Sequence, residues 1–518
     1  MSTWAEAETF SARWHSAVQD NASRTFLIFE SSSGTSMEWT YSDFDDLVAR
    51  AAAFLWKSGV RQESAVHLAL ANSPAFVALW IATVRLGAWM VPSDPFGSST
   101  EFAEHIARTR PAVGFCASSR CDAYMGAVPT MPVFHVNEDD WQLEVFGNTR
   151  FTQWPQVGLR DRAAVMFTSG TTGRPKGVVI SQANYAFAGK TMSEAAHLSS
   201  QHRQIVVLPM FHANAQYYSF ASAIWARASV ALMHTFSASK FLTQVAQHKA
   251  THASLFAAPI RMILAKGPKR VSDMSLEHCW YAMNISLEQH KTLSDLLGCA
   301  PRQLYGMTET IPAVLTDLTP KSNPASMGLV TDGCEVEIWD ADHNVVPAGT
   351  VGEVVVRGEA GITLFDGYLD DPQTTANSFA DGWFLTGDRA SRDESGSFYF
   401  DGRRQDVLKV AGENVSTIEV EMVLSSHLKV LEAVVVGVPD SLRDEVPVAF
   451  AVAANILDPP TIDELMLWCE QHLGKAKRPR QIVLINELPR TSVGKIRKYL
   501  IKELALRSYQ SEQQNILR

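Results

Sequence analysis

The chain has 518 residues, of which 46% are hydrophobic and 19% are charged, and its formal net charge is −10. This length exceeds what a single hydrophobic core usually serves, so we expect two or more domains. The composition is that of an ordered globular protein. The acidic balance disfavours nucleic acid as the main partner, because binding through counterion release needs a basic face.

Residues 1–60 have helical, amphipathic patterns near both ends. Residues 65–92 then predict a strand, a helix and a strand, with Ser73 as the helix N-cap and Pro74 as the first helical residue. A second such unit follows at residues 101–116. The alternation predicts a parallel sheet covered by helices.

Two features bear on the compartment. The six cysteines form no CxxC pair and have no repeating spacing, which predicts neither a zinc site nor a disulfide framework. The first residues are polar and acidic, unlike a signal peptide, and the most apolar run, residues 75–84, is too short to span a bilayer and predicts a buried helix. We therefore expect a cytoplasmic protein without a membrane span.

A glycine-rich segment, Thr168-Ser-Gly-Thr-Thr-Gly-Arg-Pro-Lys-Gly177, lies between two apolar runs that read as buried strands. Its glycines allow close backbone approach to an anion, its hydroxyls can donate to phosphate oxygens, and Arg174 and Lys176 add positive charge. It is not a Walker A loop, since Pro175, Lys176 and Gly177 stand where that loop closes with Gly, Lys and Ser or Thr. An ordinary surface turn is the alternative interpretation.

Farther on, the pattern predicts helices at residues 184–197 and 217–227 with a strand at 204–208. His248 and His252 have the spacing of a metal-binding helix, but a helix end followed by a strand start is the favoured interpretation. From about residue 325 short β segments predict a small barrel or meander. A polar stretch at 401–406 precedes a fresh alternation of helices and strands, which predicts a domain boundary.

Several further strings resemble, in order, the motifs of the adenylate-forming superfamily of acyl-CoA ligases, luciferases and peptide-synthetase adenylation domains. They are Thr168–Gly177 for phosphate, Tyr305-Gly-Met-Thr-Glu-Thr310 for adenine and magnesium, Thr386-Gly-Asp388 for ribose, Gly402-Arg403 with residues 410–415 for the hinge and a loop, and Pro489-Arg-Thr-Ser-Val-Gly-Lys495 for a late lysine. The closest resemblance is to the acyl-CoA ligase branch. Within it, Phe211-His-Ala-Asn214 and Asn284-Ile-Ser286 are similar to crotonobetaine/carnitine-CoA ligases.

The resemblance implies an α/β fold in two parts. Residues 1–402 would form a large domain of doubly wound sheets plus a small β-barrel that binds ATP and the acid. Residues 403–518 would form a small, mobile α+β domain that carries the late lysine. The implied activity is ATP-dependent: a carboxylic acid becomes an acyl adenylate with release of pyrophosphate, and coenzyme A then takes the acyl group as a thioester. ATP, Mg²⁺ and coenzyme A are the implied cofactors.

The resemblance also implies roles for individual residues. Lys495, Glu309, Thr168 and Lys176 would be catalytic, with Glu309 binding Mg²⁺. The nucleotide and coenzyme A would contact Thr168, Ser169, Gly170, Thr171, Thr172, Gly173, Lys176, Tyr305, Gly306, Met307, Thr308, Asp388, Arg403, Gly412 and Glu413. Because Lys495 and the Gly412–Glu413 loop cannot reach one site in a single pose, the small domain would rotate between the two steps.

This chain departs from the family pattern at two places. Gln405 stands at the pivot position, where relatives commonly have Asp or Lys. Because Gln is uncharged, the balance between the two poses of the small domain lacks the electrostatic contribution of that residue. The string Tyr281-Ala-Met-Asn284 replaces a glycine-rich string, and its larger side chains would narrow the acyl pocket. The candidate pocket residues are His212, Asn214, Trp280, Met283 and Asn284. An aromatic face at Trp280 or Tyr281 could hold a quaternary ammonium group.

Two alternatives remain open from the sequence. The enzyme could load an acyl or amino acid onto a carrier protein, which would have to be a separate chain because no carrier motif follows Lys495. The chain could instead be a ligand-binding regulatory protein that has lost turnover.

Overall fold

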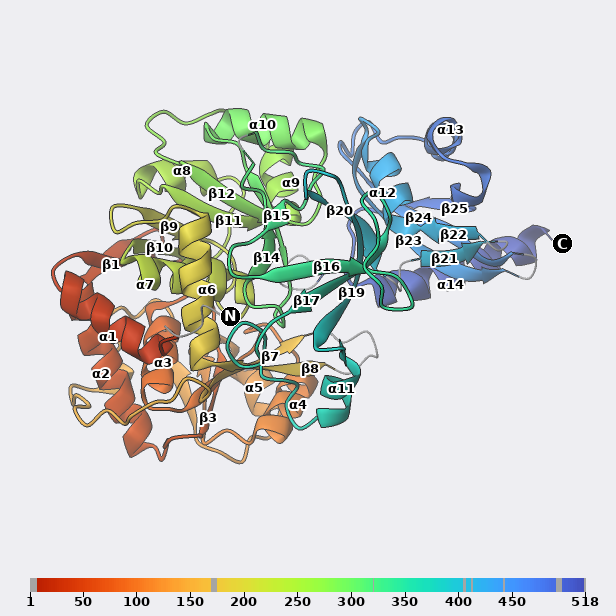
Figure 1. Ribbon diagram of the computed structural model, residues 1–518. Coiled ribbons are helices and arrows are strands. Elements are labelled where there is room, and N and C mark those ends of the chain that lie inside the picture. The colour runs from red at the N-terminus through yellow and green to blue at the C-terminus, as the bar shows by residue number, and fades with distance from the viewer. Residues whose placement is uncertain are drawn as a thin grey trace.

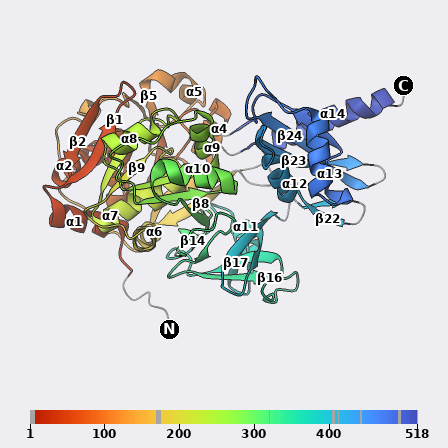
Figure 2. The ribbon, with the colours of Figure 1, turned by 90° about the horizontal axis from the view of Figure 1, so that it is seen from above.

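The computed structural model describes residues 7–168, 175–319, 321–403, 407–410, 413–440, 443–490 and 496–516. Figure 1 shows a large body that contains the N-terminal and central segments, and a smaller body at the C-terminal end, drawn in blue. Figure 2 shows the same division from above. The fold is therefore a mixed α/β architecture with a large N-terminal and a small C-terminal part, as predicted.

The first large sheet has six strands in the order β6-β5-β3-β4-β7-β8. Neighbouring strands are parallel except β7 and β8, which form an antiparallel pair. Its strands are β3 (Ala65–Ala69), β4 (Trp89–Pro92), β5 (Val113–Ala117), β6 (Val133–Val136), β7 (Arg162–Thr168) and β8 (Lys176–Ser181). Between β3 and β4 lies α3 (Pro74–Arg85), capped by Ser73 and buried along its whole length. The predicted strand, helix, strand unit and its buried helix are confirmed.

The second large sheet has nine strands in the order β15-β14-β13-β12-β11-β9-β10-β1-β2. Its central strands are parallel, and antiparallel strands complete both edges. The strands are β1 (Thr25–Glu30), β2 (Ser36–Thr40), β9 (Arg203–Val206), β10 (Ser229–Met233), β11 (His252–Phe256), β12 (His278–Ala282), β13 (Arg302–Gly306), β14 (Ala313–Thr316) and β15 (Leu329–Val330).

Helices join the two large sheets. One hydrophobic cluster contains side chains of both sheets together with side chains of several helices between them. The helices of the large part are α1 (Phe10–Asn21), α2 (Tyr41–Lys57), α4 (Ser99–Thr109), α5 (Cys121–Met125), α6 (Gln182–Ala195), α7 (Ser222–Ala226), α8 (Phe241–Gln247), α9 (Ala257–Ala265) and α10 (Leu287–Leu297). The segment η4 (Asn214–Ala221) is a π-helix that runs directly into α7 and packs against β9 and β11.

The two histidines with metal-like spacing lie in different elements. His248 follows the end of α8, and its Nε2 lies 2.7 Å from Oε2 of Glu30. His252 begins β11, and its Nε2 lies 3.0 Å from the carbonyl oxygen of Ala196. The interpretation as a helix end followed by a strand start is confirmed.

A third, antiparallel sheet follows, with the order β16-β17-β19-β18 and β20 paired to β19. Its elements are β16 (Glu335–Trp339), β17 (Gly352–Arg357), α11 (Pro372–Asn377), β18 (Phe379–Ala380), β19 (Trp383–Arg392) and β20 (Phe398–Arg403). These pairings make it a meander, one of the two forms that the sequence left open. The predicted domain boundary after Gly402 stays a prediction; β20 runs one residue beyond it, through Arg403.

The small part is built on a sheet of order β22-β21-β24-β23, with β25 beside β24. Along β23, Val434, Val436 and Val438 belong to a cluster that includes side chains of α14, whereas Ala433 and Val435 belong to a cluster with α12 and α13. This alternation is the two-residue period of a strand covered on both faces. The elements are β21 (Val407–Val410), β22 (Glu413–Ser416), α12 (Thr417–Ser425), β23 (Val430–Asp440), β24 (Asp444–Ala453), α13 (Ile462–His472), β25 (Gln481–Leu484) and α14 (Lys498–Ile516). None of the helices in the described part of the chain has the length and apolar character that crossing a bilayer requires.

Candidate active site

The turn between β7 and β8 begins at Thr168 and ends near Lys176, which are Cα partners in the antiparallel pair. The hydroxyl of Thr168 donates to the carbonyl oxygen of Lys176 at 3.5 Å. The predicted phosphate-binding residues Ser169, Gly170, Thr171, Thr172 and Gly173 lie outside the described residues. The structure therefore fixes the two ends of the predicted phosphate loop.

Lys176 is connected to Glu309 through an aromatic ring. Its ammonium nitrogen lies 4.7 Å from the ring centroid of Tyr368. The hydroxyl of Tyr368 donates to Oε1 of Glu309 at 3.1 Å. Burial, reinforced by the Glu309 carboxylate, raises the pKa of Tyr368 well above its ordinary value, so the phenol stays a donor. A cation from the first predicted motif thus contacts the ring of one tyrosine, and a carboxylate from the second motif contacts the hydroxyl of the same tyrosine.

Glu309 is held by backbone contacts just beyond the end of β13. Its carbonyl oxygen accepts a hydrogen bond from Phe365 N at 3.0 Å, and the carbonyl of Thr308 accepts one from the Tyr217 hydroxyl at 3.5 Å. The carboxylate is buried. At Gly306 a side chain is excluded, because a Cβ atom would lie 2.7 Å from the carbonyl oxygen of Pro312.

Asp388 is the meeting point of two other predicted residues. Tyr305 donates from its hydroxyl to Oδ2 of Asp388 at 2.7 Å, and Arg403 donates from Nε to Oδ1 at 3.0 Å. The register of β19 and β20 sets this contact, since Asp388 and Arg403 are Cα partners. Burial, followed by the charge of Asp388, raises the pKa of Tyr305. A carboxylate oxygen can accept more than one hydrogen bond, so these contacts are compatible with a ligand hydroxyl at Asp388.

The donor set at Glu309 fits a hard cation such as Mg²⁺, which prefers carboxylate and phosphate oxygens. Among the described residues, no group of three or more His, Cys, Asp or Glu side chains could hold a metal ion together. Nucleotide phosphates and water could supply the other ligands of a cation at Glu309.

The predicted pocket residues around the π-helix have different surroundings. The ring of His212 packs on Phe211 with 4.5 Å between centroids. Asn214 is the first residue of the π-helix and is buried, yet within the described structure neither its amide oxygen nor its amide nitrogen has a hydrogen-bond partner. A buried amide without partners is costly, and π-helical turns frequently occur at functional sites. Asn214 therefore remains a candidate for contact with a ligand.

The predicted pocket residues in β12 and just after it have different surroundings. Trp280 is buried and its ring lies 4.2 Å from that of His278, while Tyr281 belongs to a hydrophobic cluster on the other side of the sheet. At most one of these two rings can face a shared pocket, because successive strand residues point to opposite faces. Met283 is 49% exposed and adopts a left-handed backbone conformation, with φ of 73°. That conformation favours glycine, the residue type of the family string.

Asn284 is tied to the sheet and to a neighbouring helix. Its Oδ1 accepts a hydrogen bond from Gln303 Nε2 at 3.1 Å, and its carbonyl oxygen accepts one from Arg261 at 2.9 Å. The structure therefore holds Asn284 firmly, at the end of the strand that precedes β13 in the sheet.

The predicted residues of the small part are only partly described. Gln405, Gly412 and Lys495 lie outside the described residues, and Glu413 is described only as the first residue of β22. The flanks of the late lysine motif are described: Arg490 and Ile496 form an antiparallel bridge. The roles of these residues stay predictions.

Two residues near the site were missed by sequence reasoning. Tyr368 lies beside β8, since Val179 N donates to the carbonyl of Gly367 and Leu369 N to that of Gly177. Arg108 donates to the carbonyl oxygen of Pro175 at 2.5 Å, and its guanidinium lies 4.9 Å from the ring centroid of Phe167. No spacing or composition signal marks either residue, because both contacts are made over long sequence separations.

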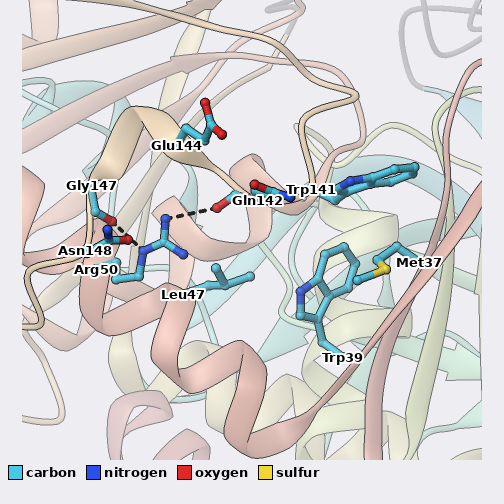
Figure 3. A pocket seen from close by; sticks show the side chains of 9 residues that line it. All are labelled: Met37, Trp39, Leu47, Arg50, Trp141, Gln142, Glu144, Gly147 and Asn148. Atoms are coloured by element: carbon cyan, nitrogen blue, oxygen red, sulfur yellow. Dashed lines mark hydrogen bonds between the residues drawn. The ribbon is translucent and has the colours of Figure 1, made fainter.

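A surface hollow of about 650 Å³ lies elsewhere, between α2, β2 and residues 141–148. Figure 3 shows two tryptophans, Trp39 and Trp141, on one side of it and Arg50 on another. The guanidinium of Arg50 already makes hydrogen bonds within the protein, since it donates to the carbonyl oxygens of Gln142 and Gly147. None of the predicted site residues lines this hollow.

The chain is similar to known proteins over most of its length. A family model described as AMP-binding enzyme matches residues 14–369, and one described as AMP-binding enzyme C-terminal domain matches residues 419–495. Crotonobetaine/carnitine–CoA ligase from Escherichia fergusonii is 32% identical over 507 residues, which cover 94% of this chain and 98% of that protein.

Solved structures of CoA ligases have the same fold. ATP-bound MatB from Rhodopseudomonas palustris superimposes with a TM-score of 0.86 at 23% identity, over 96% of this chain and 98% of that one. The o-succinylbenzoate CoA synthetase of Bacillus subtilis, in complex with its acyl-adenylate intermediate, gives a TM-score of 0.84 at 25% identity, over 95% and 97% of the two chains. The chain belongs to the AMP-binding enzyme family, in the branch of the acyl-CoA ligases.

Proposed function

We propose that the β7–β8 turn, the end of β13 and the β19–β20 hairpin bind one molecule of ATP in this enzyme. The enzyme is an AMP-forming acid:CoA ligase, which makes an acyl adenylate and then an acyl-CoA thioester. The observation that carries the site assignment is the series Lys176, Tyr368 and Glu309, in which a cation and a buried carboxylate approach one ring. A cation suits the phosphates of a nucleoside triphosphate, and a carboxylate suits the metal ion that accompanies them.

In the first step the carboxylate of the acid attacks the α-phosphate of ATP, and pyrophosphate leaves. The two reactants are both anionic, so positioned cations and donors must offset their repulsion. Lys176 and the hydroxyl of Thr168 hold the departing pyrophosphate, and Thr308 contacts the α-phosphate. Glu309 would hold Mg²⁺, which would supply positive charge beside the phosphate oxygens.

Asp388 binds the ribose. Its two oxygens already accept hydrogen bonds from Tyr305 and Arg403, which fix the orientation of the carboxylate. The same carboxylate accepts hydrogen bonds from the ribose hydroxyls. The ring of Tyr305 offers an apolar face beside the nucleotide.

Lys495 reaches the site from the small domain and bridges the acid carboxylate and the α-phosphate as negative charge builds. The arrangement of the small sheet supports a second pose for thioester formation. In the order β22-β21-β24-β23, β23 and β22 stand at opposite ends, and Glu432 on β23 contacts Arg261 of the large part. Figure 1 shows β22 farther from the large part than β23. The domain therefore rotates to bring the Gly412–Glu413 loop to the site for coenzyme A.

For the acid, crotonobetaine and carnitine are the first candidates, because the similar ligases are named for them. The unpartnered amide of Asn214 supports contact with a polar group of the acid or of the acyl adenylate. His212, Trp280, Met283 and Asn284 remain candidates for the rest of the pocket.

The test is acid-dependent exchange of labelled pyrophosphate into ATP, over a panel of betaine, straight-chain and aromatic acids. We expect exchange with at least one acid, and thioester formation with free coenzyme A. Transfer only to a phosphopantetheinyl carrier protein would instead make the enzyme a carrier-loading one. Complete absence of exchange over the panel would contradict the proposal and favour the ligand-binding regulatory protein.

A further inference from the structure

One ion pair links the two parts of the molecule close to the site. Arg261 on α9 and Glu432 on β23 approach to 3.7 Å, from Nη1 to Oε2, with only 19% and 9% of their side chains exposed. Figure 2 shows α9 on the side of the large part that faces β23. The second terminal nitrogen of Arg261 donates to the carbonyl oxygen of Asn284 at 2.9 Å. Arg261 thus joins the segment after β12 to the small domain.

Glu432 has a second partner within the small domain, the guanidinium of Arg490. Arg490 in turn forms a backbone bridge with Ile496, and Arg497 donates from Nε to the carbonyl oxygen of Arg490 at 3.1 Å. Residues 490 and 496 stand directly before and after the segment that contains Lys495. A continuous series of contacts therefore runs from Asn284 through Arg261 and Glu432 to the base of the late lysine motif.

The charged groups that surround Arg261 depend on the relative position of the two domains. Burial lowers the pKa of Arg261, and the carboxylate of Glu432 opposes that effect most strongly. The charge of Arg490 lowers the pKa further, and Glu421 opposes it more weakly than Glu432. Both carboxylates belong to the small domain, so a rotation that removes β23 from α9 would leave Arg261 without them. A contact that exists in only one of two poses shifts the population toward that pose.

We propose that the Arg261–Glu432 pair holds the small domain in the pose that delivers Lys495, so that Arg261 is a positioning residue for adenylation and opposes the change to the thioester-forming pose. This inference rests on the proposed two-pose mechanism. It predicts that loss of the Arg261 charge slows adenylation without slowing thioester formation, an asymmetry that a merely structural role would not produce.

The experiment compares wild-type enzyme with Arg261→Gln and Arg261→Lys, using an acid that supports pyrophosphate exchange in the wild type. For Arg261→Gln we expect kcat for exchange to fall about three- to tenfold, with little change in KM for ATP, as for the loss of one partly buried charge pair. Thioester formation from supplied acyl adenylate and coenzyme A should be unchanged or faster. Arg261→Lys, which keeps the charge, should recover most of the exchange rate.

Two further variants make the result decisive. Glu432→Gln removes the other charge of the pair and should give the same asymmetry. Arg478→Gln breaks an ion pair with Glu470 inside the small domain, 2.6 Å long, and should leave the ratio of the two rates at the wild-type value. Equal losses in both half-reactions, or no change in either, would overturn the inference while wild-type exchange leaves the proposed function intact.

Discussion

The hydroxyl group of Tyr368 donates a hydrogen bond to the buried carboxylate of Glu309, with 3.1 Å between the two oxygens. The two residues are 59 positions apart in the chain. They meet because the strand-like segment around Gly367 pairs with β8 while Glu309 follows β13. Tyr368 therefore orients the carboxylate of the proposed magnesium ligand.

Tyr368→Phe removes this hydrogen bond and keeps the ring beneath Lys176. Because hydrogen bonds that orient a metal ligand typically change metal affinity about tenfold or more, we expect the Mg²⁺ concentration for half-maximal pyrophosphate exchange to rise about tenfold. Tyr399→Phe is the matched control, since its hydroxyl donates to Asp393 in a turn away from the site. An unchanged Mg²⁺ dependence would show that Glu309 needs no such support.

Asp388→Asn removes the charge that accepts from Tyr305 and Arg403 and, as proposed, from the ribose. A hydrogen bond to a charged group contributes about 1.5–3 kcal/mol, so kcat/KM for ATP should fall roughly 10- to 100-fold. With 2′,3′-dideoxy-ATP, which lacks the hydroxyls, wild type and variant should have similar kcat/KM. Equal losses with both nucleotides would contradict a ribose contact.

Lys495→Ala tests the late lysine directly. Removal of a donor that stabilises transition-state charge costs roughly 100- to 1,000-fold in rate, so adenylation measured by pyrophosphate exchange should fall by that factor. Thioester formation from supplied acyl adenylate should be retained. Lys498→Ala, three residues away and paired with Glu421 at 3.3 Å, is the control. Comparable losses of both steps in Lys495→Ala would refute the assigned role.

A buried histidine, His67, and a half-buried one, His105, predict a pH dependence of stability. His67 and His105 share the hydroxyl of Ser93, and burial lowers their pKa to about 3 and about 4. Below pH 6.5 these imidazoles are protonated in the unfolded chain but stay neutral in the folded protein. As the pH falls, each residue therefore lowers the free energy of unfolding by up to about 1.4 kcal/mol per pH unit. That loss continues until the pH approaches the folded pKa.

His105→Gln isolates this contribution. The variant should be less stable than wild type at pH 7, and the difference in free energy of unfolding should narrow as the pH falls from 6.5 to 5. Urea denaturation at a series of pH values measures it. A difference that stays constant over this range would mean that His105 titrates normally in the folded protein.

Local patterns in the sequence were enough to predict much of the fold. Ser73 and Pro74 mark the start of α3, and the string Thr386-Gly-Asp388, matched to the family, identified Asp388, which lies within β19. The contacts that organise the site are long-range and left no such pattern. Arg108 reaches Pro175, 67 residues away, and Tyr368 reaches Glu309 across the space between two sheets. Period-based reasoning also gave residues 217–227 as an ordinary helix, because side-chain spacing does not distinguish a π-helical turn from an α-helical one.

In the π-helical segment, the number of residues between Asn214 and Ala221 determines which way the side chains of the segment point. Tyr217 lies within it and donates to the carbonyl of Thr308. Deleting one residue before Tyr217 would let the segment close as an ordinary α-helix and would turn that side chain by about 100° around the helix axis. The phenol would then point away from the Glu309 segment, although every remaining amino acid type was preserved.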